Sequence, residues 1–257
     1  MLRIFRLILL ICLFYGAGSF GEDIASGDTV ITLNVSPDKI KVGTFYNGSS
    51  VRISADIPVC DGAVLVMEAG KEEIKLNRKG RVAGIWLNVA KVTVRNVPTV
   101  YLLAASDKLE NICSPDRRRE LRLGSEYLQN QIQFVSDKPL TGLEFEEFLK
   151  LKTDNGTYKM DIAINLEMTE PAKMRLSTAL PIAPTIPPGT YHIMLYCFAG
   201  GNPIARGTSQ LTVESTGLAR LMVNLAENNA AVYGILAIAV SMVVGIMMGV
   251  IFNWLRG

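Results

Sequence analysis

The residues of this chain that could carry chemistry centre on its single histidine. His192 lies two residues before Met194 in a predicted strand, where side chains two positions apart share a face. Met168 and Met174 fall in neighbouring predicted strands, so imidazole and thioether groups could together bind copper. Alternatively, the histidine packs in the core beside methionines, which fill core gaps readily. We expect this packing role and no bound metal, and a copper site at His192 and Met194 is the alternative.

Nucleophilic catalysis has little support in the sequence. A Ser-His-acid or Cys-His arrangement would have to use the same His192, and the chain contains no GxSxG motif around a serine nucleophile. We therefore expect no enzyme activity and no cofactor. An envelope enzyme with an unrecognised site is a further alternative.

Two basic clusters could bind anions. The first spans residues 78–81, and the second consists of Arg117, Arg118, Arg119 and Arg122. Guanidinium groups pair well with oxyanions, lipid head groups or the carboxylates of a partner. The second cluster begins in the first turn of a predicted helix, where positive charge opposes the helix dipole. It is therefore the better candidate for an anion or partner contact, although both clusters can also be solvated surface.

Charge and cysteine content bound the class of protein. The net charge of +2 offers no basis for nucleic-acid binding. Three cysteines follow the N-terminal segment, namely Cys60, Cys113 and Cys197. They allow one disulfide with three possible pairings, which stay open, and none lies in a CxxC motif.

The C-terminal segment has the length and composition of a membrane span. Residues 230–252 are uninterrupted by charge and are followed by Trp254 and Arg256. At about 1.5 Å per residue, the segment can cross a hydrocarbon core of about 30 Å. Small residues recur every four positions within it, at Ala237, Ser241, Gly245 and Gly249. We expect this stripe to pack against a helix of a partner membrane protein or of a second copy.

The N-terminus has the features of a signal peptide. Arg3 and Arg6 precede an apolar run, and Ala17 and Ser19 have the spacing that a signal peptidase reads. We predict a signal peptide over residues 1–19, with an uncleaved anchor as the alternative. Together the two ends predict single-pass type I topology. An exported domain spans residues 20–215, a juxtamembrane amphipathic segment 216–229, the span 230–252 and a cytoplasmic stub 253–257.

The exported part reads as mainly β. Residues 51–57 alternate apolar and polar side chains, and residues 31–35 do the same, which is typical of strands with one buried face. Asn47-Gly48 predicts a hairpin turn between a strand at 40–45 and the next one. Further strands are expected at 63–68, 91–97, 100–104, 162–168 and 174–180.

A two-helix insertion is predicted at about 114–156. Ser114-Pro115-Asp116 is a helix start, and Thr141 with Glu144 has capping-box spacing for a second helix that ends before Asn155-Gly156. The strand after the insertion is apolar on both faces as far as Phe198, so it should be central in its sheet. We expect the Tyr191 side chain to bond back to the backbone, and a last strand to return through Leu211 and Val213. The predicted fold is an Ig-like β-sandwich with a helical insertion and one C-terminal transmembrane helix.

Several segments, in this order and with these two ends, resemble the Alph_Pro_TM family of proteobacterial transmembrane proteins. They are F-Y-N-G at 45–48, G-I-W-L-N at 84–88, P-T-V-Y-L-L-A-A-S at 98–106 and A-L-P-I-A-P-T-I-P-P-G-T-Y at 179–191. The resemblance implies a bacterial inner-membrane protein with its main domain in the periplasm, associated with transporters of the sulfite-exporter class. It implies no established activity and no binding residues.

A looser resemblance is to periplasmic copper-resistance sandwich proteins, which share the Pro-Gly-x-Tyr strand. Their Asp-Gly-His metal ligand is replaced here by Gly200-Gly201-Asn202. We therefore expect a non-catalytic, membrane-anchored binding or accessory subunit, and a copper-handling module is the alternative.

Overall fold

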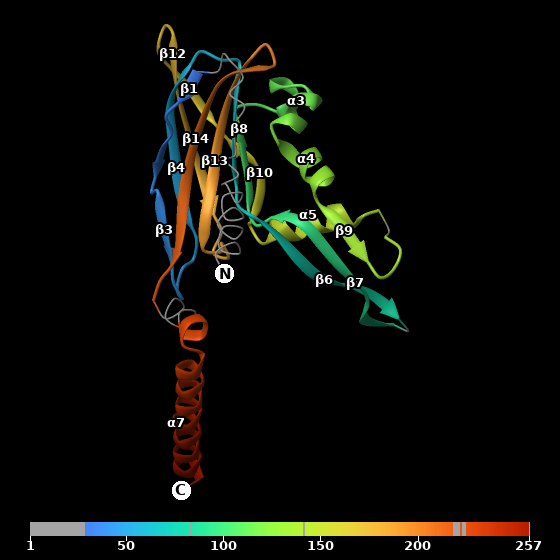
Figure 1. The fold of residues 1–257 in the computed structure, drawn as a ribbon, viewed down its shortest axis with the longest axis vertical. Coiled ribbons are helices and arrows are strands. Elements are labelled where there is room, and N and C mark those ends of the chain that lie inside the picture. Colours follow the sequence, from blue (N-terminus) through green and yellow to red (C-terminus); the bar gives the residue numbers. More distant parts are fainter. Residues whose placement is uncertain (1–28, 83, 141, 218–221, 223–224, 257) are drawn as a thin grey trace, which may run out of the picture.

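The computed structural model describes residues 29–82, 84–140, 142–217, 222 and 225–256. The predicted signal peptide lies outside these residues, as do Leu218 and Leu221 of the predicted juxtamembrane segment. Two β-sheets pack face to face, a third sheet with short helices lies beside them, and one long helix leaves the domain at its lower end (Figure 1).

The larger sheet has seven strands in the order β1-β14-β13-β5-β8-β10, with β3 beside β14. β13 pairs antiparallel with β14 and β5, and β5 with β8, but β1 and β3 run parallel to β14, and β10 runs parallel to β8. The strands are β1 (Thr29–Ile31), β3 (Lys39–Val42), β5 (Gly62–Glu68), β8 (Tyr101–Ala105), β10 (Tyr158–Ala163), β13 (Gly189–Ala199) and β14 (Asn202–Ser215).

The smaller sheet has the order β11-β12-β4-β2 and covers one face of the larger sheet. Its strands are β2 (Asn34–Ser36), β4 (Ser49–Pro58), β11 (Asn165–Glu170) and β12 (Lys173–Ile182). The main core lies between the two sheets. In β4 the odd-numbered residues from Val51 to Ile57 are buried in this core, as the alternation predicts.

The third sheet and the helices form a second layer. The sheet has the order β6-β7-β9, with β6 (Lys71–Val82), β7 (Ile85–Pro98) and β9 (Gln133–Ser136). The helices are α2 (Leu109–Ile112), α3 (Pro115–Glu120), α4 (Gly124–Gln131) and α5 (Glu144–Asp154). A second core joins this layer to the outer face of the larger sheet, with Val64, Tyr101 and Phe198 on the sheet side and Leu128 and Phe148 on the other.

Burial on both faces explains the apolar strands at the centre of the larger sheet. In β5, Leu65 and Met67 face the main core, whereas Val64 and Val66 face the second core. β13 lies between β14 and β5, which confirms the predicted central strand. The mainly β fold class with one apolar C-terminal helix is confirmed, and the immunoglobulin-like assignment stays a prediction.

The predicted hairpin at Asn47-Gly48 is wrong. β3 pairs with β14 in the larger sheet, and β4 pairs with β12 and β2 in the smaller one, so the turn carries the chain between sheets. Two further segments that were each predicted as one strand are also split between the two sheets. Residues 31–35 supply the end of β1 and most of β2, and residues 162–168 supply the end of β10 and most of β11.

The insertion differs from the predicted helix pair. Ser114 caps α3 by accepting the backbone N–H of Arg117 at 3.4 Å, as predicted, but the helix ends at Glu120. Arg122 and Gly124 have φ values of 62° and 84°, a left-handed conformation that breaks an α-helix. The second helix begins at Glu144 with Leu143 at its N-cap, and the predicted cap Thr141 lies outside the described residues. The Glu144 carboxylate accepts the backbone N–H of Gly142 at 2.8 Å. β9, which the sequence did not predict, lies between the two.

The last element is α7 (Ala230–Arg256). Its stretch Ala230–Trp254 contains an 18-residue window with a mean hydropathy of 2.7, and α7 is the one helix among the described residues that is long and apolar enough to cross a membrane. The helix continues past Phe252, so residues 253–256 of the predicted cytoplasmic stub are helical rather than irregular.

Candidate functional site

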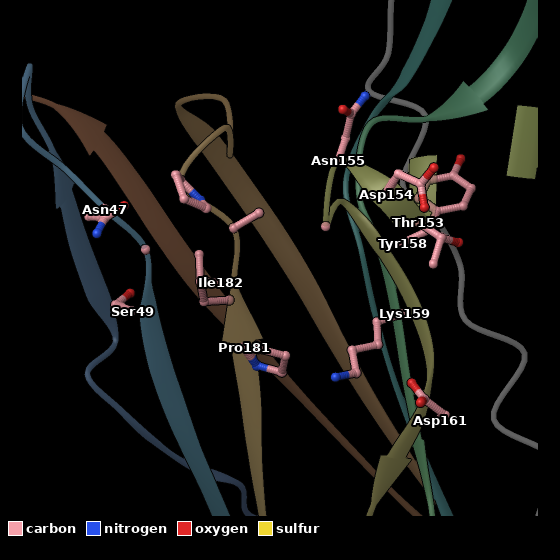
Figure 2. Close-up of a pocket in the computed structure, with 14 residues that line it drawn as sticks. Asn47, Ser49, Thr153, Asp154, Asn155, Tyr158, Lys159, Asp161, Pro181 and Ile182 are labelled. Atoms are coloured by element: carbon pink, nitrogen blue, oxygen red, sulfur yellow. The ribbon is translucent and has the colours of Figure 1, made fainter. Parts of the chain in front are cut away.

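A cleft of about 740 Å³ lies at the seam where β10 of the larger sheet approaches β12 of the smaller one (Figure 2). Four segments line it. They are residues 153–156 at the end of α5, residues 158–161 of β10, residues 181–184 at the end of β12, and residues 47–49 before β4.

Two glycine turns pack against residues 181–184, which form the floor of the cleft. Gly48 and Gly156 have φ values of 89° and 72°, which side-chain-bearing residues rarely adopt. A Cβ at Gly48 would lie 3.0 Å from the carbonyl oxygen of Ile182, and one at Gly156 would lie 3.2 Å from Cβ of Ala183. Because both glycines pack on this floor segment, their turns set the position of Asn47 and of the 153–155 segment.

Charged side chains lie along one wall of the cleft. Figure 2 shows Lys159 of β10 reaching toward Pro181 of β12. Asp161 lies further along β10. Asp154 adds a second carboxylate at the end of α5. Donors and acceptors are therefore both present, which suits hydrogen bonding to a polar ligand.

Tyr158 lines the cleft but cannot act there as an acid or base. Its hydroxyl donates to the carbonyl oxygen of Pro98 at 2.7 Å, and burial raises the pKa of the phenol well above its usual range. The lining contains no histidine or cysteine. Across the described part of the chain, no group of His, Cys, Asp and Glu residues suits a metal ion.

The four arginines of the predicted cluster each form an ion pair with a carboxylate of the same chain. Arg117 pairs with Glu120 at 2.6 Å, and Arg119 pairs with Asp116 at 2.5 Å. Both pairs join residues three positions apart on the surface of α3. Exposed pairs of this kind contribute little to stability and stay accessible to solvent.

The other two arginines of the cluster contact residues outside α3. Arg118 is 8% exposed and pairs with Glu110 at 3.0 Å and Glu126 at 3.5 Å, so it joins α2, α3 and α4. Arg122 lies 3.8 Å from Glu68 of β5. The four guanidinium groups therefore do not converge on one point, and contact with an external anion or partner stays a prediction.

His192 and Met194 of the alternative copper site share one face of β13, but the other two methionines are not placed beside them. Met194 packs against the second core and Met174 against the main core, on opposite faces of the larger sheet. His192 is exposed, with Glu68 and Gln210 as its cross-strand neighbours, so it does not pack in the core as we expected. Met168 is also exposed, on β11. Tyr191 does bond back to the backbone as predicted, donating to the carbonyl oxygen of Pro187 at 2.6 Å.

The cysteines divide into one contact pair and one isolated thiol. Cys60 and Cys197 are hydrogen-bonded to each other, and this bond lowers the pKa of Cys60 and raises the pKa of Cys197. Cys113 lies in the second core, where burial raises its pKa. All three are free thiols.

The small-residue stripe lies on an exposed helix. Apart from the adjacent residues and backbone of α7 itself, no described atom lies within 4 Å of the position that a Cβ would take at Gly245 or Gly249. The Ser241 hydroxyl donates to the carbonyl oxygen of Ala237 at 2.8 Å, so its hydrogen-bonding capacity is met within α7. The stripe is therefore open to another helix, and nothing in the described part of the domain covers it.

Sequence reasoning missed the cleft and the exposed end of the β6–β7 hairpin. The cleft depends on the meeting of four distant segments, and only the glycines at 48 and 156 marked it in the sequence. The hairpin end carried a clearer signal, since Trp86 lies beside apolar residues and follows the basic run at 78–81.

Comparison with known families gives one finding. The model of the Alph_Pro_TM family, described as "Putative transmembrane protein", matches residues 30–254. No curated protein matches the chain.

Proposed function

Since the chain belongs to the Alph_Pro_TM family of transmembrane proteins, we propose that it is a single-pass membrane protein acting as a non-catalytic binding or accessory subunit. One observation carries the proposal. The apolar window of α7 is 0% buried against the described part of the β domain. A surface of that hydropathy needs lipid or another apolar helix around it.

Two surfaces support a binding role. The small-residue stripe on α7 leaves open space at Gly245 and Gly249, where a second helix can approach closely. The cleft at the β10–β12 seam offers donors and acceptors at the end of the domain where β14 ends and the chain continues toward α7. A chain with a helix-packing face and a recognition cleft is suited to hold one partner in the membrane while contacting it outside.

The proposal also assigns a location and a partner class. The resemblance and the two chain ends support a bacterial inner membrane, type I topology and a periplasmic β domain. The partner we propose is a transporter of the sulfite-exporter class, with self-association as the other use of the stripe. The resemblance supports this assignment, and the packing of α7 provides its test.

Replacing Gly245 and Gly249 together with leucine tests the partner contact. Leucine keeps the hydropathy of α7, so insertion and membrane level should not change. The added side chains separate the helices and should weaken association by about 1–3 kcal/mol. Crosslinking in native membranes, followed by purification in mild detergent, should therefore recover the partner or second copy with the native chain and lose it with the variant.

A matched control lies on the opposite face of α7. Replacing Met247 and Ile251 with leucine places the same two residues at the same spacing on that face, and should leave the complex intact. If the Gly245 and Gly249 variant keeps every crosslinked complex, α7 is an anchor alone and partner binding through the span is wrong.

A further inference from the structure

The end of the β6–β7 hairpin exposes a group of large apolar side chains. We define the hairpin tip as residues 79–82 and 84–88. Val82, Ile85, Trp86 and Leu87 in the tip are 48%, 64%, 67% and 49% exposed. Contiguous apolar exposure of this kind marks an interaction surface rather than ordinary surface scatter.

The register of the hairpin sorts these side chains by face. Val82 pairs with Ile85 and Gly80 pairs with Leu87, and directly opposite residues in an antiparallel pair share a face. One face of the tip is therefore apolar. Gly80 contributes no side chain there, and the space is filled by Val89, whose methyl would lie 2.8 Å from a Cβ at position 80.

The opposite face of the tip combines an aromatic ring with positive charge. Trp86 pairs with Arg81, and Lys79 pairs with Asn88, so these four side chains lie together. Within the described residues no ion pair joins Lys79 or Arg81 to a carboxylate. The chain contains no Asp or Glu from residue 74 to residue 106. The tip therefore has uncompensated positive charge beside its apolar face.

Among the described residues, no strand outside the hairpin pairs with the tip. Further back, β9 pairs with residues 92–95 of β7, and Val92 and Val94 are buried in the second core. Lys91 and Arg78 still bond to Asp137 and Pro139, but beyond them the two strands of the hairpin pair only with each other. A two-stranded ribbon is marginally stable in water alone, so an external surface would hold it in place.

We propose that the hairpin tip contacts the membrane surface and binds anionic lipid head groups beside α7. Trp with Lys or Arg is the composition of protein segments at the membrane interface, where the ring and the aliphatic side chains enter the acyl boundary and the cations remain among the head groups. In Figure 1 the hairpin points toward the end of the domain from which α7 leaves, and its tip lies near the level where α7 is joined. This inference rests on α7 spanning the membrane, as proposed above.

The two tryptophans allow the contact to be measured in the full-length chain. The protein is reconstituted in nanodiscs of phosphatidylcholine, alone or with phosphatidylglycerol, and brominated lipid serves as a quencher of nearby tryptophan. In the Trp254→Phe variant, Trp86 reports on the tip. We expect its emission to shift to shorter wavelength and to be quenched, more strongly when phosphatidylglycerol is present. The further change of Lys79 and Arg81 to glutamate should remove that dependence on lipid charge.

Two control variants separate this inference from the proposed span. Trp86→Phe leaves Trp254 as the reporter, and quenching of Trp254 shows that α7 is inserted whatever the tip does. In a chain lacking both native tryptophans, Met168→Trp reports from a similarly exposed position on β11, beside Met174 at the end of the smaller sheet opposite Ser49 and Ile182. We expect no quenching there.

Three outcomes overturn the inference. Quenching of Trp86 no greater than that of the Met168→Trp reporter places the tip in water. A shift to shorter wavelength without quenching shows that protein, either a second copy or a partner, covers the tip. Equal quenching with and without phosphatidylglycerol excludes recognition of anionic head groups.

Discussion

At the scale of single residues, the most informative contact is the one between Cys60 and Cys197. Cys60 lies in the turn between β4 and β5 and packs against the main core, which contains Cys197. Cys113 lies in the second core, across the larger sheet. Of the three pairings that the sequence leaves open, the structure brings one into contact.

We predict that oxidation joins Cys60 to Cys197. With oxidised glutathione as the oxidant, each disulfide formed releases two molecules of reduced glutathione, and the lowered pKa of Cys60 makes it the attacking thiolate. Closing so long a loop should stabilise the fold by roughly 4 kcal/mol. Peptide mapping without reductant should find this bond with Cys113 alkylated alone. A bond that includes Cys113 would contradict the arrangement of the two cores.

At the scale of elements, the short strand β1 depends on a glycine in its neighbour. Ile31 of β1 lies opposite Gly207 of β14 in parallel register. A Cβ at Gly207 would lie 2.7 Å from the carbonyl oxygen of Ile31 and 3.2 Å from Cγ of Leu33. The first contact is with backbone, which cannot turn aside, so β1 would have to move.

We therefore predict that Gly207→Ala loosens β1 and destabilises the domain by about 1–3 kcal/mol. Thermal unfolding of the full-length protein in detergent should show the lower midpoint, and hydrogen exchange at residues 29–31 should become faster. Gly70→Ala is the matched control, because a Cβ at Gly70 meets nothing within 4 Å. Equal midpoints for the two variants would show that β1 adds no stability.

At the scale of the whole molecule, the orientation of α7 determines the side of the membrane on which the β domain lies. We predict type I topology, because Arg256 follows the span and positive charge favours the cytoplasmic side. A reporter that fluoresces only in the cytoplasm should be bright when fused after Gly257 and dark when fused after Thr216. The reverse pattern would place the cleft and the hairpin tip in the cytoplasm.

Local pattern was enough to predict the elements whose burial depends on their own composition. The alternation of residues 51–57 predicted one buried face of β4, and the apolar run to Phe198 predicted the central position of β13. The length and hydropathy of residues 230–252 predicted α7. These predictions succeeded because hydrophobic periodicity reports how many faces of an element are buried, whichever element covers them.

Contacts between distant residues decided the rest. The break between α3 and α4 is held by Tyr101 of β8, whose hydroxyl donates to the carbonyl oxygen of Arg122 and accepts the N–H of Gly124. Near Leu33 and Ile164 the alternation of buried and exposed side chains continues along the chain, but the backbone hydrogen bonds change from the larger sheet to the smaller one. The cleft exists only where four separate segments meet, and Ile85, Trp86 and Leu87 are exposed because no other described element packs on them. Sequence pattern specifies which side chains avoid water, but the partner of each strand and the cover of each face are set by tertiary packing.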